Sequence, residues 1–393
     1  MATTIQKNWK DVSPNRILAI LEKRFSKPDG QPIDGVASDC INGFIDADKL
    51  DYLIRDSNGC GVPYGRGMDP QRLISALSFT AFLEAGTVRL GLAYKAKARP
   101  AIESMLIARY QMYGAVYWHH TFRCVQAMFS HAANLTFGSL SGTTTKMRGV
   151  QLKASDIEEL FYQKVILGKS WTEVRDDFNR IARREVLPKE FTAEFSAPIS
   201  GERAIEFVYR FAEDTTRRLL DRLIARVLYK RAFELRVGEF GGDYFRIKAE
   251  FTPEKKLKNA RAIQEKLVNS IDSEMRQRGR RDSVSENAAS GRLSMLRRDD
   301  TPLVVIDFPV RAIPSDLNPP REIADPDRKY FALPAQKRQE SDNVFAVVRK
   351  LQMQVAALRV FVAPDLHELV IRYLRPSAVA ACVSAIMPFA RTQ

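Results

Sequence analysis

The residues with the most evident chemistry lie in Phe44–Asp56, where aspartates are interleaved with a lysine, a tyrosine and an arginine. If this segment is a helix, Asp48, Tyr52 and Asp56 share one face, because side chains four residues apart lie above one another. Lys49 lies on the flank of that face. The segment therefore predicts a site where carboxylates, a cation and a phenol converge, groups that suit a metal ion, a phosphate or a sugar hydroxyl.

The same charge pattern is also typical of a solvated helix face with its leucines buried behind it. Two features of the neighbouring sequence favour a site instead, and the first is the sequence that directly follows the segment. The segment is followed by a glycine-rich turn, Gly59–Gly65, and then by Asp69-Pro70. The aspartate is suited to capping a new helix and the proline to its first turn.

The second feature is a long helix that we predict to begin at Pro100. Along it Arg109, Tyr113, Tyr117 and His120 recur at helical spacing and form one stripe of polar and aromatic groups. An arginine followed by two aromatic residues suits a phosphate beside a flat base. The spacing is also compatible with tyrosines that belong to an ordinary amphipathic core.

Four motifs occur in order along this part of the chain: D-A-D-K-L-D-Y-L-I-R-D-S, G-V-x-Y-G, M-D-x-x-R-L-I and A-I-E-S-M-L-I-A-R-Y-Q-M-Y-x-x-V-Y-x-H-x-T. Together they resemble the second half of the HD-domain phosphohydrolases. Within that family they are most similar to the deoxynucleoside triphosphate (dNTP) triphosphohydrolases of the sterile-alpha-motif/HD-domain type. The resemblance is strong over residues 30–135 and continues more weakly to about residue 310.

The resemblance implies a role for each matched residue. Asp48, the second aspartate of D-x-D, would be the last ligand of a catalytic metal, and Lys49 would contact the triphosphate. Asp56 would bind the 3′-hydroxyl of the sugar, and Arg109 would bind phosphate. Three tyrosines match further substrate-binding positions, two of them beside the base and the sugar: Tyr52, Tyr113 and Tyr117.

The sequence departs from the family at the rest of the metal centre. The resemblance implies a His and an adjacent His-Asp pair upstream of D-x-D, but all four histidines follow Asp48 and none precedes an aspartate: His119, His120, His131 and His367. A catalytic metal needs several converging ligands. We therefore expect half an active site. A partner chain would supply the H…HD ligands for Mg²⁺, Mn²⁺ or iron, and no metal or activity is expected on this chain alone.

Composition limits the other possibilities. The 393 residues, 45% of them hydrophobic, suffice for two or three domains. No apolar run of about 20 residues indicates a membrane span, no secretory signal is present, and four cysteines without C-x-x-C spacing favour the cytoplasm. The sequence has no phosphate-binding loop, nucleophile elbow or H-E-x-x-H zinc motif. The net charge of +14 favours a polyanionic partner, either nucleotides or nucleic acid.

Helical patterns dominate to about residue 235 and a mixed pattern follows. Capping boxes are predicted at Ser155–Glu158 and Ser170–Glu173, and one longer helix after Gly201. The mixed region contains predicted strands at Tyr244–Phe251, Leu303–Phe308 and Leu358–Val362, helices near 254–275, near 343–356 and from Asp365, and a flexible linker near 276–300.

We accordingly predict a mainly α protein. Residues 1–235 would form an incomplete HD-type helical domain, and residues 236–393 a small α+β C-terminal lobe. The predicted function is a dNTP triphosphohydrolase-like subunit or split half that works in an oligomer or complex. One alternative is a catalytically inactive protein that senses nucleotides or serves as a nucleic-acid-binding scaffold. Another is a truncated product that folds only within an assembly.

Overall fold

The computed structural model describes residues 13–22, 31, 33–84, 87–137, 145–147, 150–166, 170–183, 201–236, 252–278, 283–308, 322–323 and 357–387. The chain forms two compact units. Unit 1 is Met1–His119 with Arg311–Val355, and unit 2 is His120–Val310 with Ala356–Gln393. Most described residues are helical and the sheets are small, which confirms a mainly α fold with a small α+β part. The predicted domain boundary after residue 235 stays a prediction.

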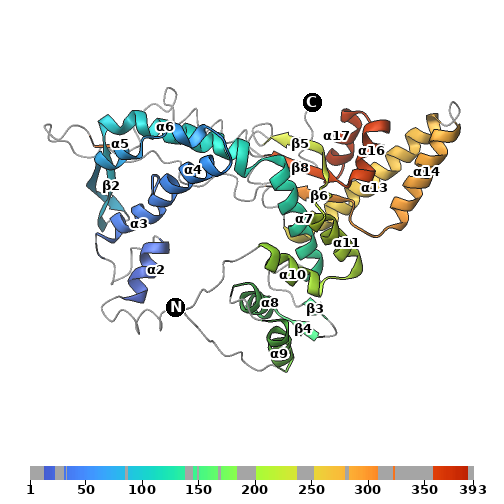
Figure 1. The fold of residues 1–393 in the computed structure, drawn as a ribbon, viewed down its shortest axis with the longest axis horizontal. Coiled ribbons are helices and arrows are strands. Elements are labelled where there is room, and N and C mark those ends of the chain that lie inside the picture. The colour runs from blue at the N-terminus through green and yellow to red at the C-terminus, as the bar shows by residue number, and fades with distance from the viewer. Residues whose placement is uncertain are drawn as a thin grey trace. The chain divides into compact units, whose positions relative to one another are not determined.

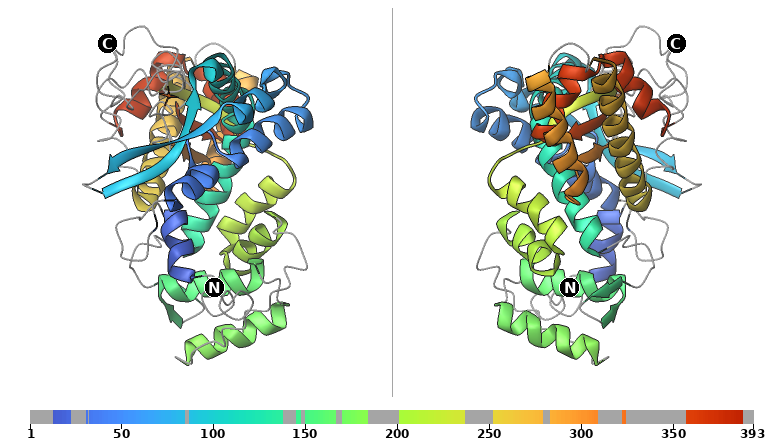
Figure 2. Two further views of the ribbon diagram at one scale, coloured as in Figure 1. Left: turned by 90° about the vertical axis from the view of Figure 1, so that its left-hand side faces the viewer. Right: turned by 90° about the vertical axis from the view of Figure 1, so that its right-hand side faces the viewer.

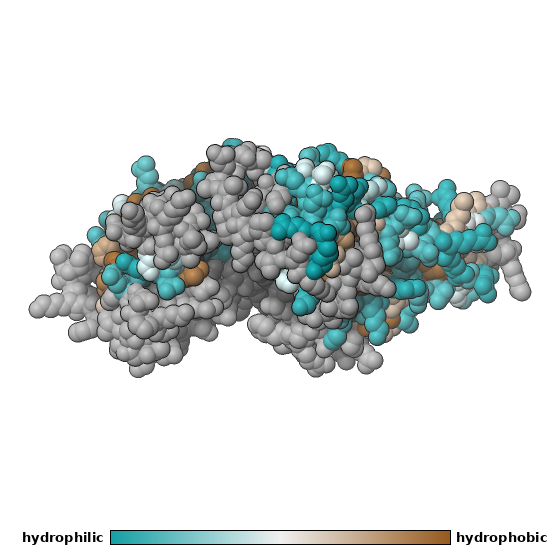
Figure 3. Space-filling view, turned by 90° about the horizontal axis from the view of Figure 1, so that it is seen from below, coloured by the Kyte–Doolittle hydropathy of each residue, from teal (hydrophilic) through white to brown (hydrophobic). Residues whose placement is uncertain are grey.

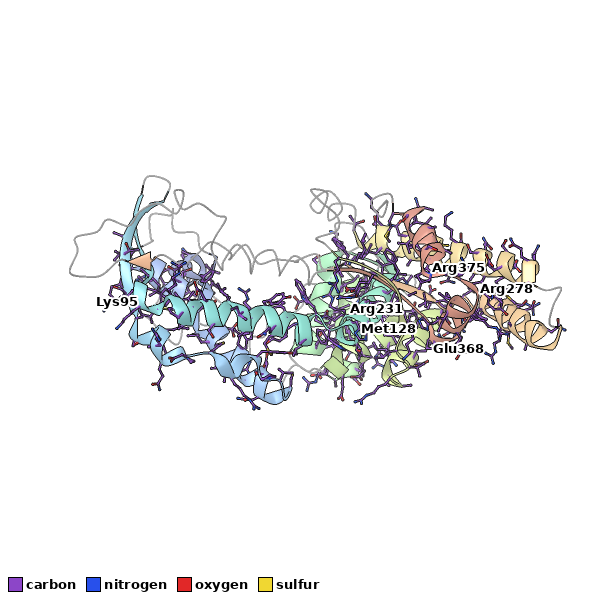
Figure 4. The ribbon with its side chains drawn as sticks, turned by 90° about the horizontal axis from the view of Figure 1, so that it is seen from above. Lys95, Met128, Arg231, Arg278, Glu368 and Arg375 are labelled. Carbon is purple, nitrogen blue, oxygen red and sulfur yellow. The ribbon has the colours of Figure 1, made fainter. Side chains whose placement is uncertain are left out.

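Unit 1, whose residues before His120 are coloured blue to cyan in Figure 1, combines helices with one small sheet. Its helical elements are α2 (Pro14–Glu22), α3 (Asp34–Asn42), α4 (Ala47–Gly59), η1 (Tyr64–Gly67), α5 (Pro70–Ser75), η2 (Ala96–Ala98), α6 (Arg99–Met112) and η3 (Tyr113–Tyr117). Its strands are β1 (Leu77–Glu84), β2 (Thr87–Lys95) and β7 (Glu322–Ile323). β1 and β2 form a long antiparallel hairpin, visible in the left view of Figure 2, and β7 pairs in parallel with the end of β2 at Lys95, which Figure 4 labels.

Helices dominate the first 235 residues as predicted, but the β1–β2 hairpin among them was not predicted. Its sequences, L-S-F-T-A-F-L-E and T-V-R-L-G-L-A-Y-K, mix apolar, aromatic and threonine residues that suit a pleated surface. The sequence analysis did not recognise two strands of this kind separated by a short connection. The predicted helix start at Asp69-Pro70 is confirmed. The Asp69 carboxylate accepts the Arg72 N–H at 2.9 Å and caps α5, with Pro70 in its first turn.

The core of unit 1 lies where α4, η1 and α6 meet. Leu53 of α4 and Met105 of α6 are fully buried there. The glycine-rich turn brings η1 directly onto α4: a Cβ at Gly65 would lie 2.1 Å from the Leu53 carbonyl oxygen. Ser57 fixes this contact, because its hydroxyl donates to the Val62 carbonyl at 2.6 Å and accepts the Gly65 N–H at 3.0 Å. The turn therefore sets the position of α4 against α6.

Unit 2 contains a three-stranded antiparallel sheet in the order β5–β8–β6, with helices packed against it. The strands are β5 (Lys230–Arg236), β6 (Val304–Asp307) and β8 (Ala357–Val362), and β3 (Thr145–Met147) and β4 (Val150–Leu152) form a separate small hairpin. The helical elements are α7 (His120–Phe137), α8 (Ala154–Phe161), η4 (Tyr162–Ile166), α9 (Trp171–Ala182), α10 (Gly201–Phe211), α11 (Asp214–Ile224), α13 (Pro253–Arg278), α14 (Ser283–Arg298), α16 (Pro364–Tyr373) and α17 (Pro376–Ser384). Met128 of α7, labelled in Figure 4, is buried in this unit.

Several predictions in unit 2 are confirmed. β6, β8 and α13 lie where strands and a helix were predicted, and all residues of β6 and β8 are buried. Ser170 and Glu173 form the predicted capping box of α9. The C-terminal helix was predicted one residue late, because α16 begins at Pro364, and α17 follows it.

Other predictions in unit 2 are corrected. Residues 283–298 of the predicted linker form helix α14, which lies beside α13 in Figure 1 and in the right view of Figure 2. The predicted capping box at Ser155–Glu158 is wrong, because α8 begins at Ala154 and Ser155 therefore lies inside the helix instead of capping it. The long helix after Gly201 is two helices, α10 and α11, the second of which begins with acidic residues. The predicted strand Tyr244–Phe251 and the helix near 343–356 lie outside the described residues.

One face of the molecule is mostly polar over its described residues. In the view of Figure 3, hydrophilic residues predominate over the coloured part of the molecule, and hydrophobic ones are scattered between them. No helix in the described ranges is long and apolar enough to cross a membrane. The four cysteines are unpaired.

Candidate functional site

Helix α4 begins at an aspartate that also binds a lysine of the same turn. The Asp46 carboxylate accepts the Lys49 backbone N–H at 2.7 Å and so caps the helix. Its other oxygen lies 2.5 Å from the Lys49 ammonium, which also donates to the Gly43 carbonyl oxygen at 2.7 Å. Both side chains are buried. A triphosphate would therefore have to compete with Asp46 for the lysine.

The sequence analysis did not select Asp46 as a site residue. The signal was nevertheless present, since an aspartate just before a helix is a typical N-cap. The D-x-D motif thus contains two aspartates with different surroundings. Asp46 is buried against Lys49, whereas Asp48 is exposed in the first turn of α4.

Asp48 alone does not form a metal centre. In the part of the chain that the structure describes, no three His, Cys, Asp or Glu side chains lie close enough to hold a metal ion. A divalent metal in a catalytic site needs several protein ligands. The described residues therefore do not fit a complete metal site, and Asp48 as a ligand stays a prediction.

The end of α6 differs from the uninterrupted helix that the sequence predicted. α6 ends at Met112 and continues as the π-helical turn Tyr113–Tyr117, in which the Trp118 N–H donates to the Tyr113 carbonyl at 2.8 Å. His120 begins the next helix, α7. It therefore does not continue the stripe of Arg109, Tyr113 and Tyr117 as predicted, because the helix is interrupted before it.

Three tyrosines from α4 and the end of α6 form one cluster. The rings of Tyr113 and Tyr117 lie 5.1 Å apart and those of Tyr52 and Tyr117 lie 5.9 Å apart, both edge to face. The Tyr117 hydroxyl donates to the Asp56 carboxylate at 2.9 Å. Two segments that are more than 50 residues apart in sequence thus bring four of the candidate residues together.

The phenols of Tyr52 and Tyr117 are held in the protonated form. Burial, followed by Tyr113, raises the pKa of Tyr52 far above its ordinary value, and Arg109 acts in the opposite direction. Burial and the hydrogen bond to Asp56 raise the pKa of Tyr117. Near neutral pH Tyr52 and Tyr117 therefore offer hydroxyl donors and aromatic faces and do not act as phenolate bases.

Arg109 is the charged residue beside this cluster. It is only 3% exposed, and its guanidinium carbon lies 5.6 Å from the centre of the Tyr113 ring, a distance typical of a cation–π contact. Its Nε atom is buried without a hydrogen-bond partner, and Arg109 forms no ion pair with any residue that the structure describes. Burying a cation without a carboxylate costs free energy. The guanidinium is therefore a buried cation whose charge no described carboxylate neutralises.

Part of this chain matches known proteins. Residues 68–205 match the family model of the HD associated region, which links the chain to HD-domain proteins. The uncharacterized protein MJ1154 of Methanocaldococcus jannaschii is 34% identical over 154 residues, which cover 39% of this chain and 30% of that protein. The uncharacterized protein YwfO of Bacillus subtilis is 31% identical over 90 residues, 23% of this chain and 19% of that protein. The matched region thus spans less than a third of either relative.

Among solved structures, a hypothetical protein from Aquifex aeolicus aligns with 95% of this chain and 70% of its own. The identity is 17% and the TM-score is 0.44.

Proposed function

We propose that unit 1 is the nucleotide-binding half of an HD-type phosphohydrolase site that acts on dNTPs. Arg109 would bind phosphate, the tyrosine cluster would hold base and sugar, and Asp56 would accept a sugar hydroxyl. The observation that carries the proposal is the buried Arg109 guanidinium with its unpartnered Nε beside Tyr113. The match to the HD associated region includes this helix and supports the same class of protein.

The metal ligands that this chain lacks would come from a partner chain that carries the His and His-Asp motifs. Asp48, exposed at the start of α4, would add the last ligand. Exposed apolar residues support a partner for unit 1, because large side chains on α2, α3 and the neighbouring turn are 43–48% accessible: Leu18, Leu21, Ile33 and Ile41. Light scattering after gel filtration should therefore detect an oligomer or a hetero-complex.

The test is calorimetric titration of the purified chain with each of the four dNTPs in the presence of EDTA. Arg109, the tyrosine cluster and Asp56 can contact a nucleotide without a metal, so weak dNTP binding is expected. Arg109→Ala should weaken it about tenfold to a hundredfold, because a hydrogen bond to a charged group contributes about 1.5–3 kcal/mol. Arg66→Ala is the matched control, since Arg66 is an exposed arginine of unit 1 that bonds only Asn58 among the described residues.

Equal affinities of Arg109→Ala and the unmodified chain would show that the site assignment is wrong. The metal half of the proposal has a separate test. In a complex reconstituted with the H…HD-bearing chain, Asp48→Ala should abolish hydrolysis and leave nucleotide binding largely intact. Hydrolysis that survives this substitution would exclude Asp48 as a ligand.

A further inference from the structure

Unit 2 contains a cavity of about 390 Å³ that plays no part in the proposed dNTP site. One wall is a face of α7, the second is the first turn of α13, and the third is strand β6. The lining residues from α7 are Arg123, Gln126, Ala127, Phe129, Ser130, His131 and Asn134. α13 contributes Lys256 and Leu257, and β6 and the residue after it contribute Ile306, Asp307 and Phe308.

Most charges in this cavity already have partners. The Arg123 guanidinium donates to both carboxylate oxygens of Asp307, from Nε at 2.8 Å and from Nη2, and its Nη1 donates to Gln126 at 2.9 Å. Arg359 approaches the same carboxylate at 3.7 Å. Asp307 is thus paired with two arginines, Arg123 and Arg359. It does not form an ion pair with the remaining cation of the lining, Lys256.

Lys256 is half-buried and makes no side-chain hydrogen bond or ion pair with another residue of the described chain. Burial lowers the pKa of its ammonium, Asp307 raises it and Arg123 lowers it. The lysine also lies in the first turn of the 26-residue helix α13, where the helix dipole adds positive potential. The cavity therefore carries excess positive charge at one point of its wall.

The rest of the lining suits a small organic body. Ser130 and Asn134 offer a hydroxyl and an amide, and Phe129 and Phe308 offer apolar rings. His131 is buried, and burial lowers its pKa to about 4, so near neutral pH it adds no charge. A cavity of 390 Å³ is far larger than the roughly 30 Å³ that one water occupies in the liquid and falls in the range of small-molecule sites. A bare anion would leave most of it unfilled.

We propose that this cavity binds a small phosphorylated metabolite, with the phosphate on Lys256 and the carbon body against α7 and Phe308. A lysine ammonium binds phosphate as a point charge, without the paired geometry that a carboxylate and an arginine require. The ligand neutralises a cation that has no ion-pair partner among the described residues. This inference does not rest on the proposed dNTP site, which lies in unit 1.

The experiment uses the full chain and three probes: inorganic phosphate, ribose 5-phosphate and ribose. Lysines are reductively methylated with and without each probe, and modification is quantified by peptide mass spectrometry. Ribose 5-phosphate should slow the modification of Lys256 at least fivefold, inorganic phosphate should do so less, and ribose should have no effect. Lys258, exposed on the same helix, is the internal control and should react equally in all samples. This measurement needs no variant, so it does not depend on whether a variant folds.

Titration calorimetry with ribose 5-phosphate adds a second measurement. Lys256→Met should weaken binding at least tenfold, and Lys258→Met should leave it unchanged. The proposal is overturned if no probe protects Lys256, if ribose protects it as well as ribose 5-phosphate does, or if Lys256→Met binds like the unmodified chain. Binding that is lost in Arg109→Ala and kept in Lys256→Met would also overturn it, because the ligand would then occupy unit 1.

Discussion

Two arginines, one in each unit, are both largely buried but differ in the group that offsets their charge. Arg109 in unit 1 is almost completely buried, and it contacts the face of Tyr113 without any carboxylate among the described residues. Arg123 in unit 2 has 15% of its side chain exposed and donates to both oxygens of Asp307. A cation–π contact offsets about 0.5–2 kcal/mol of the cost of burying a guanidinium, which is less than a paired carboxylate contributes in the same surroundings.

The difference separates a structural charge from one that is available to a ligand. Arg123 and Asp307 satisfy each other, so their expected role is to hold α7 against β6. Arg109 has no carboxylate partner among the described residues, which is what we expect of a group that binds an anionic ligand. We therefore predict opposite effects on stability: breaking the Arg123–Asp307 pair should destabilise the protein, and removing the Arg109 charge should stabilise it.

The largest effect is expected from Asp307→Ala. The substitution leaves Arg123 and the buried Arg359 without their shared carboxylate, and losing one partner of a buried ion pair costs about 3–5 kcal/mol. Urea unfolding should detect this loss. The control is Asp214→Ala, whose carboxylate is 88% exposed and lies 3.4 Å from Arg217, and which should cost less than about 1 kcal/mol. Similar effects of the two substitutions would contradict a structural role for Asp307.

A second effect concerns His131 and pH. Burial lowers the pKa of His131 from 6.5 to about 4, so between these values the unfolded chain holds a proton that the folded chain does not. The free energy of unfolding therefore falls as pH decreases from 6.5 to 4, by roughly 3 kcal/mol from this residue. Above pH 6.5 the contribution is constant.

The measurement is urea unfolding at a series of pH values for the unmodified chain and His131→Gln. The difference between the two should change across pH 4–6.5, which isolates His131 from His367 and from the carboxylates that also titrate. Arg123, Lys256 and Asp307 line the same cavity as His131 and are present in both chains, so the comparison of the two chains tests His131 itself. A difference that is independent of pH would mean that the pKa of His131 is the same in the folded and the unfolded chain.

The sequence predicted the local parts of this arrangement better than the long-range ones. Spacing of four residues placed Tyr52 and Asp56 on one face of α4, and the Ser170 capping box was readable from four adjacent residues. The break after Tyr117 was not readable, because a π turn has no strong residue preference that separates it from an α-helix. The β1–β2 hairpin was missed because its strands follow a short helix without a proline or glycine at their start.

The cavity of unit 2 could not be predicted from sequence at all. Arg123 and Asp307 are 184 positions apart, and no spacing rule connects a residue of a helix with one of a distant strand. The same limit applies to the roles of charged residues. Lys49 and Arg109 both matched phosphate-binding positions, yet only the structure distinguishes a lysine bound to Asp46 from an arginine with an unpartnered Nε.

The third prediction is that removing the charge of Arg109 stabilises the protein. Arg109→Met keeps an unbranched side chain and removes a buried charge that has no carboxylate partner in the described part of the chain. We expect the free energy of unfolding to rise by about 1–2 kcal/mol, as can occur when buried ionic groups are replaced by apolar ones. Thermal and urea unfolding would show it, together with the loss of dNTP affinity. A loss of several kcal/mol would instead assign Arg109 a structural role like that of Arg123.

The smallest effect is expected at the hydrogen bond that joins the two helices of the site. Tyr117→Phe removes the hydroxyl that donates to Asp56 at 2.9 Å but keeps the ring contacts with Tyr52 and Tyr113. The expected loss of stability is about 0.5–1.5 kcal/mol, the usual net contribution of one hydrogen bond. Tyr110→Phe is the matched control on α6, because its hydroxyl has no hydrogen bond with another described residue.

A double-mutant cycle with Asp56→Ala assigns this effect to the pair. If the Tyr117 hydroxyl acts only through Asp56, Tyr117→Phe should cost nothing further in the Asp56→Ala background, and the coupling free energy should equal the loss in the single variant. The cycle also bears on ligand binding. Freed from Tyr117, the Asp56 carboxylate can accept a sugar hydroxyl without competition, so Tyr117→Phe should weaken dNTP binding far less than Arg109→Ala does. A hundredfold loss of affinity in Tyr117→Phe would mean that the tyrosine hydroxyl, and not Asp56, contacts the nucleotide.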